Sequence, residues 1–289
     1  MAELGNNRVG LEERVLEVSL IPKLRAIVVV AAALVIPAMS LGEQVRVRHT
    51  EGLVHGFLAL RTLEGAPLAD GDLMQTARGT TVTSRLVFHF KDGSLYREIT
   101  KFTQRGTFRL VSDQVTQNGP SFKQESESWI DVQSGKVTVR TTEKGKEKTT
   151  TKQVTLPADV SNGMLLILAK NMDPSAPETM LSMVALTDKP RVVKLRFTPS
   201  EERPIKFGLF TFKAQQYVMK VKIEGAAGKI APLIGKQPPD SHFWIVKSES
   251  PTFYQFEGPL SADGPVWRME LSAPEADAHG TDKNEKKSE

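Results

Sequence analysis

The side chains best suited to acid–base or metal chemistry in this sequence are its five histidines. His49 and His55 flank Glu51, whereas His89 and His242 stand apart. Histidine ligands of metals occur at recognisable spacings, such as two histidines four residues apart on a helix beside a glutamate, and no such spacing occurs here. The pattern favours surface or hydrogen-bonded histidines over a metal centre. An enzyme would require His49, His55 or His242 to converge with carboxylates in a cleft.

Motifs for covalent catalysis and nucleotide binding are also missing. The chain has no cysteine, which excludes disulfides, thiolate metal sites, cysteine nucleophiles and lipidation of an N-terminal cysteine. It has no Gly-x-Ser-x-Gly motif for an activated serine. Residues 225–229 resemble part of a phosphate-binding loop, but they lack the Ser or Thr that follows in such loops. We therefore predict a noncatalytic protein with no cofactor and no metal.

The most unusual segment spans residues 225–244, where apolar residues stand beside lysines. Such a loop could close over a hydrophobic cavity or dip into a membrane surface. Alternatively, it covers the open end of a barrel and supplies core side chains, which is the commoner role of apolar residues in a long loop. The residues assigned to a candidate ligand-binding site are Ile230, Leu233, Ile234, Lys229, Lys236 and Trp244.

Alternation of apolar and polar side chains along most of the chain predicts β-strands. Leu86, Phe88 and Phe90 share one face of such a strand, and an Asp-Gly turn typical of a hairpin follows at Asp92. Similar segments recur from Val45 to Leu271 with short connections. About a dozen strands make a sheet long enough to curl. We expect a mainly β fold, built as a large curved antiparallel sheet or incomplete barrel.

One segment departs from this alternation. Residues 164–172 are mostly unbranched helix formers, with capping candidates before them at Ser161 and Asn162 and with Pro174 after them. The pattern predicts one short helix at about residues 161–172. Because this helix is apolar almost all round, we expect it to be buried within the curved sheet.

The first 42 residues have the pattern of a secretory signal. Lys23 and Arg25 precede an apolar run at residues 26–36, and small residues follow. The run is shorter than the about 20 apolar residues of a membrane-spanning helix, which favours a cleaved signal over a retained anchor. Two cleavage positions fit, one before Leu41 and one before Glu43. Export with a cleaved signal, and no cysteine for lipidation, predicts a periplasmic or extracellular protein that is not a lipoprotein.

The remaining chain is expected to form a single β-rich domain at residues 43–272, followed by a disordered polar tail at residues 273–289. Its composition, 39% hydrophobic and 25% charged, is that of a globular domain without a transmembrane span. The net charge of +4 is spread along the strands rather than clustered, which argues against nucleic acid as a partner. The absence of disulfides in an exported protein favours a bacterial source.

Five stretches of the chain resemble an uncharacterised family of bacterial exported, β-rich proteins. They are KFTQRGTFRL (101–110), NGPSF (118–122), GKQPPD (235–240), EGPL (257–260) and PVWR (265–268). The resemblance covers residues 51–272 and implies an envelope location and a β fold, but no catalytic residues. An open barrel is also similar in architecture to bacterial lipoprotein carriers and lipocalins.

Two functions fit these observations. The first is noncatalytic binding of an apolar small molecule or lipid in the concavity of the sheet, indicated by the inward aromatic side chains and by the lysine-rimmed loop. The second is an envelope scaffold without a small-molecule ligand, which would meet another protein through the Thr- and Lys-rich hairpin at residues 136–156. The free space inside the sheet is the property that separates these two functions.

Overall fold

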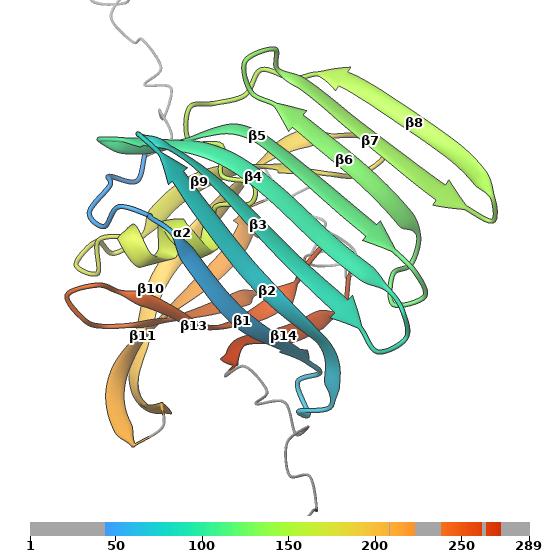
Figure 1. The fold of residues 1–289 in the computed structure, drawn as a ribbon. Helices are drawn as coiled ribbons and strands as arrows, with labels where there is room; N and C mark the ends of the chain where they lie inside the picture. The colour runs from blue at the N-terminus through green and yellow to red at the C-terminus, as the bar shows by residue number, and fades with distance from the viewer. Residues whose placement is uncertain (1–43, 208, 223–237, 262–263, 273–289) are drawn as a thin grey trace, which may run out of the picture. The chain divides into compact units, whose positions relative to one another are not determined.

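The computed structural model describes residues 44–207, 209–222, 238–261 and 264–272 (Figure 1). The predicted signal at residues 1–42 and the predicted tail at residues 273–289 lie outside these ranges. The described part of the chain contains no helix with the length and hydropathy of a membrane span.

The strands form a 14-stranded antiparallel sheet in the order β8-β7-β6-β5-β4-β3-β2-β1-β14-β13-β12-β11-β10-β9. Their bounds are β1 Val54–Arg61, β2 Pro67–Arg78, β3 Thr81–Phe90, β4 Leu95–Arg105, β5 Thr107–Asn118, β6 Glu125–Asp131, β7 Lys136–Glu143, β8 Lys146–Gln153, β9 Thr179–Ala185, β10 Arg191–Phe207, β11 Phe210–Lys222, β12 Ser241–Val246, β13 Thr252–Pro259 and β14 Val266–Ser272. Two meanders, β1–β8 and β9–β14, are joined by pairing of the first strand with the last. The predicted curved antiparallel sheet is confirmed.

Alternation along each strand places one row of side chains on the concave side of the sheet. In β3, Leu86 and Phe88 belong to the main core, and Phe88 is completely buried. The sheet bends around helix α2 (Leu165–Asn171), which contacts β12 and β13 (Figure 1). Ile167 and Leu168 of this helix are buried in the same core, which confirms a helix buried inside the sheet.

The helix is shorter at its N-terminus than the predicted range of 161–172. Ser161 and Asn162 do not cap it, because their side chains bind the edge strand β9. Ser161 Oγ donates to the Ser182 carbonyl at 2.7 Å, and Asn162 exchanges two hydrogen bonds with the backbone of Val184, at 3.0 and 2.8 Å. The N-cap position is Met164, which makes no side-chain capping bond. Competition from the unpaired edge of β9 therefore overrides the local capping signal.

The two ends of the sheet, β8 and β9, are bridged by side chains and by the connecting segment between them. Val160 forms a parallel bridge with Ser182 and so covers part of the β9 edge. From β8, Lys148 pairs with Asp188, and Lys152 Nζ donates to the Pro190 carbonyl at 3.1 Å. These contacts hold the sheet as an incomplete barrel without a continuous backbone ladder between β8 and β9.

Candidate functional site

Of the six predicted ligand-binding residues, one lies among the described residues. Ile230, Leu233, Ile234, Lys229 and Lys236 fall outside them. Trp244 of β12 is buried, but it packs with Ile205 and Ala214 in a small cluster separate from the main core. The Arg203 guanidinium lies 4.4 Å from its ring centroid. Trp244 therefore faces the convex side of the sheet, whereas its neighbour Phe243 faces the concave core.

Two open cavities lie on the convex side. One, of about 440 Å³, is bordered by Arg203, Glu257 and Arg268. Its charges already have partners, since Arg268 Nε donates to Glu257 Oε1 at 2.8 Å and Arg203 donates to Gln255 at 3.2 Å. The other, of about 480 Å³, lies over β4–β7 beside Trp129. Neither cavity gathers side chains that point to a particular ligand.

The concave wall offers a more specific arrangement, a row of four side chains on adjacent strands. Strand register places Leu73 of β2 beside Leu86 of β3, Leu86 beside Glu98 of β4, and Glu98 beside Val115 of β5. Leu73 and Glu98 are half-buried, and Leu86 and Val115 keep 6% and 8% of their surface accessible. We call these four residues the concave row.

The neighbouring rows are also largely buried, and Ser84 and Gln117 within them keep 5% and 8% of their surface accessible. Phe88 and Tyr96 lie on one side of the concave row, with exposures of 0% and 3%, and Gln75 and Thr100 lie on the other, each with 1%. Within the concave row, Leu73 and Glu98 are the two side chains that keep more than a small accessible surface. Glu98 is therefore a half-buried carboxyl group among mostly buried neighbours.

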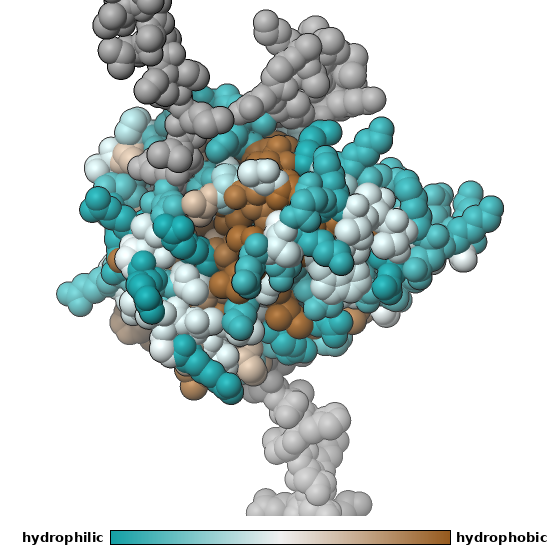
Figure 2. All heavy atoms as spheres, turned by 90° about the horizontal axis from the view of Figure 1, so that it is seen from above, coloured by the Kyte–Doolittle hydropathy of each residue, from teal (hydrophilic) through white to brown (hydrophobic). Residues whose placement is uncertain are grey.

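Apolar side chains from other elements share this exposure. Leu165 and Leu166 of α2 and Leu271 of β14 are half-buried and pack against the same core. Seen from above, apolar atoms are visible in the middle of the molecule, and hydrophilic residues surround them (Figure 2). The arrangement combines an accessible apolar surface with a polar rim, as small-molecule sites commonly do.

Two carboxyl groups stand on this wall, and burial changes their titration. Asp113 Oδ1 accepts a hydrogen bond from Thr100 Oγ1 at 2.8 Å, whereas Oδ2 has no partner among the described residues. Desolvation raises the pKa of Asp113 to about 7. Desolvation, with the nearby Asp113 charge, raises the pKa of Glu98 well above its usual range. The raised pKa favours the protonated form of Glu98, which can donate a hydrogen bond.

Sequence reasoning missed both carboxyl groups, although a signal for Glu98 was present. Glu98 alternates in phase with Tyr96, Thr100 and Phe102, so the same pattern that predicts the strand also turns Glu98 inward. For Asp113 the signal is weaker, because the register of β4 with β5 shifts between Lys101 and Phe102. Such a bulge breaks simple alternation.

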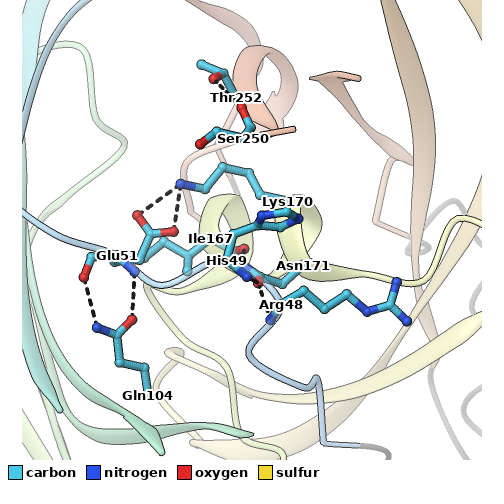
Figure 3. A network of polar contacts seen from close by, with 9 residues as sticks. All are labelled: Arg48, His49, Glu51, Gln104, Ile167, Lys170, Asn171, Ser250 and Thr252. Atoms are coloured by element: carbon cyan, nitrogen blue, oxygen red, sulfur yellow. Dashed lines mark hydrogen bonds and ion pairs between the residues drawn. The ribbon is translucent and has the colours of Figure 1, made fainter. Parts of the chain in front are cut away.

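A polar network holds α2 against the wall (Figure 3). The backbone N–H groups of Arg48 and His49 both donate to Asn171 Oδ1, at 3.0 and 2.8 Å. Lys170 Nζ lies 2.7 Å from Glu51 Oε1, and the Glu51 backbone exchanges two hydrogen bonds with the Gln104 amide of β4. The segment before β1 therefore ties the C-terminal end of α2 to β4, which fixes the helix inside the sheet.

The histidines occupy separate places. His49 contributes its backbone to the network at α2, His55 Nε2 lies 3.9 Å from Asp72 Oδ1, and His242 stacks on Trp244. His89 is exposed on β3. Within the described ranges, no three or more His, Cys, Asp or Glu side chains are arranged to hold a metal ion.

Comparisons with known proteins give one structural similarity. No protein-family model and no curated protein matches the chain. A crystal structure of a beta-barrel-like protein of domain of unknown function DUF1849 from Brucella abortus is similar at 12% sequence identity and a TM-score of 0.42. The match covers 78% of this chain and 98% of that chain. No function is inferred from this likeness, and the mainly β architecture of the chain follows from its own strand pairing.

Proposed function

We propose that this protein is a noncatalytic exported protein that binds an apolar small molecule or lipid on the concave side of its sheet. The observation that carries the proposal is a set of half-buried side chains on the concave side, namely Leu73 and Glu98 in the concave row and Leu165, Leu166 and Leu271 in elements that pack against the same core. Apolar surface left in contact with water is unfavourable by about 25 cal/mol per Å². A ligand that covers Leu73 and the other half-buried apolar side chains would recover this free energy.

The same row suggests the form of the ligand. Helix α2 fills part of the concavity, which favours a slender ligand such as a single acyl chain over a bulky one. Protonation of the Glu98 carboxyl, which its raised pKa favours, would supply a hydrogen-bond donor and would favour a ligand with an uncharged acceptor such as an ester carbonyl. The predicted ligand is therefore an uncharged lipid.

Export is part of the proposal. It is supported by the basic flank and the apolar run at residues 23–36, and by the resemblance to bacterial exported proteins. The protein would reach the periplasm or the outside of the cell with its signal removed. Sequencing the N-terminus of the protein recovered from the envelope fraction tests this point, and an intact Met1 there would contradict cleavage.

A large side chain introduced on the concave row is expected to abolish ligand binding. Val115→Trp places a large ring on the concave row, whereas Thr116→Trp places the same ring on the convex face of the same strand, where Thr116 accepts a hydrogen bond from Arg97. We expect organic extraction and mass spectrometry to find a lipid bound to the parent protein and to Thr116→Trp, but not to Val115→Trp. The bound amount in Val115→Trp should fall at least tenfold.

A second pair of variants tests the same point if Val115→Trp fails to fold. Leu73→Trp on the concave row is compared with Met74→Trp, since Met74 is 39% exposed on the convex face. Circular dichroism and thermal unfolding select the variants that fold. The proposal would be contradicted by a parent protein that is free of lipid after gentle purification, or by concave-row variants that retain the bound lipid.

The scaffold function has one specific observation in its favour. Strand β8 ends the sheet, and all of its residues except Thr150 are exposed. An end strand of this kind can pair with a strand of another protein. If it does, shortening the β7–β8 turn at residues 143–146 should abolish co-purification of that partner while the thermal unfolding of the protein stays unchanged.

A further inference from the structure

The β10–β11 hairpin extends beyond its neighbours in the sheet. Strand β9 pairs with β10 only from Arg191 to Phe197, and β12 pairs with β11 only from Ala214 to Met219. The remaining part of the hairpin, from Glu202 to Phe207 and from Phe210 to Lys213, forms strand pairs only within the hairpin, and at its base the Lys247 N–H donates to the Lys213 carbonyl at 2.8 Å. This end of the hairpin projects away from the rest of the sheet in Figure 1 (orange, lower left).

The projecting end exposes large apolar side chains. Leu209 is 100% exposed, Phe210 is 70% exposed and Phe212 is 38% exposed. The rings of Phe210 and Phe212 lie 6.3 Å apart. Adjacent exposed aromatic and aliphatic side chains at the end of a projecting element usually mark a surface that meets an apolar partner.

The hairpin end has two chemically different faces. Register places Phe212 opposite Ile205, and Phe210 lies on the same face two residues away. The other face carries Lys206 opposite Thr211 and Lys213 opposite Pro204. Both lysines are exposed, and the Lys213 charge interacts with nearby Glu202, which also pairs with Lys247. One face is thus apolar and the other cationic.

We infer that the end of the β10–β11 hairpin docks on an anionic lipid bilayer. Leu209, Phe210 and Phe212 enter the boundary between headgroups and acyl chains, and Lys206 and Lys213 lie at the anionic headgroups. Aromatic and aliphatic side chains beside exposed lysines fit such an interface. A second copy of the same hairpin would bring like charges together, which opposes self-association. This inference does not depend on a ligand at the concave row.

The test is cosedimentation of the full chain with vesicles. One vesicle preparation contains phosphatidylcholine and phosphatidylglycerol, and the other contains phosphatidylcholine alone. We expect binding to the anionic vesicles to be at least tenfold stronger. Leu209→Ser combined with Phe210→Ser should weaken that binding about tenfold or more, and Lys206→Glu combined with Lys213→Glu should do the same.

Matched controls separate the hairpin from other surfaces. Phe57→Ser removes an aromatic ring that is 40% exposed elsewhere, and Lys91→Glu with Lys101→Glu reverses two exposed charges on other elements. Neither control should change vesicle binding more than twofold. Because every variant carries the same N-terminal apolar run, its contribution cancels in the comparison.

A tryptophan introduced by Leu209→Trp gives a second readout. Its fluorescence should shift to shorter wavelength with anionic vesicles and should be quenched by brominated acyl chains. Equal binding to both vesicle types, or tip variants that bind like the parent, would overturn the inference. Self-association of the parent that the tip variants abolish, without vesicle binding, would assign the surface to a second copy instead.

Discussion

Replacing Gly163 with alanine is expected to destabilise the protein by about 4 kcal/mol or more, because the substitution introduces both backbone strain and a steric clash. Gly163 has a φ of +67°. A Cβ atom at this position would lie 1.9 Å from Thr100 Oγ1 and 2.6 Å from Asp113 Oδ1. Relieving the clash requires Thr100 to move, which breaks its hydrogen bond to Asp113. A loss of this size is a large part of the about 5–15 kcal/mol that stabilises a typical domain.

The chain offers a control that isolates the clash. Gly145, in the β7–β8 turn, has a similar φ of +74°, but a Cβ atom there would have no neighbour within 4 Å. Gly145→Ala should therefore cost only the backbone strain, about 1–2 kcal/mol. Urea unfolding of both variants measures the difference. Equal losses would show that the connecting segment does not pack against β4 and β5 as described.

A double-variant cycle identifies the neighbour that causes the clash. Thr100→Ala removes the hydroxyl group that a Cβ at residue 163 would meet. Combined with Gly163→Ala, it should cost less than the sum of the two single variants by about 1–2 kcal/mol. Simple additivity would contradict the assigned contact.

Asp113→Asn is expected to make the protein more stable at pH 8 and to leave its stability at pH 4 nearly unchanged. An unfolded aspartate titrates near 3.8, whereas Asp113 in the folded protein titrates near 7. Between these pH values the unfolded chain has released a proton that the folded protein retains, so a rise in pH favours unfolding. The resulting loss of folding stability begins near pH 4 and is complete above pH 7. A pKa shift of this size changes the free energy of unfolding by about 4 kcal/mol, at about 1.36 kcal/mol per pKa unit.

Asparagine mimics the protonated carboxyl group. Its oxygen can still accept the hydrogen bond from Thr100, and its amide group replaces the unpaired Oδ2 without a charge. The expected gain at pH 8 is up to about 4 kcal/mol. Urea unfolding at pH 4, 6 and 8 checks the prediction, with Asp70→Asn as the control because Asp70 is exposed on β2. A variant with the same pH dependence as the parent would show that Asp113 remains solvated.

The neighbouring Glu98 also makes the folded protein less stable as the pH rises. Its pKa is also raised by desolvation, and the Asp113 charge raises it further. Removing that charge in Asp113→Asn should therefore allow Glu98 to ionise at a lower pH. The residual pH dependence of the variant reports on Glu98 itself, which is the polar group proposed to contact a bound lipid.

Local features of the fold followed from the sequence with little ambiguity. The alternation of Leu86, Phe88 and Phe90 is confirmed on the concave side, and the turn after Asp92 has Gly93 at a φ of +86°. Both depend on residues close together in the chain, where side-chain period and turn chemistry are decisive. The predicted start of the helix, in contrast, was wrong, because Ser161 and Asn162 bind β9, a strand about twenty residues away in the chain.

The candidate site was much less predictable. Glu98 could have been found from its inward phase in β4, but its protonation depends on what surrounds it. The apolar composition of residues 225–244 led to the prediction of a ligand-binding site there. Trp244, the one predicted site residue that the structure describes, instead packs on the convex side with Ile205 and Ala214. Composition indicates that a residue is apolar, but it does not say which face of a sheet will cover it.

The sequence by itself therefore determined the class of structure, a curved antiparallel sheet with one short buried helix, because strand period and helix composition are local properties. Only the tertiary structure decided which distant segments meet. It paired β1 with β14, brought Thr100, Asp113 and Gly163 together, left Leu73 and Glu98 half-buried on the concave wall and extended β10–β11 beyond the sheet. These arrangements depend on pairing across long stretches of chain, and alternation fixes the face of each side chain but not its neighbours.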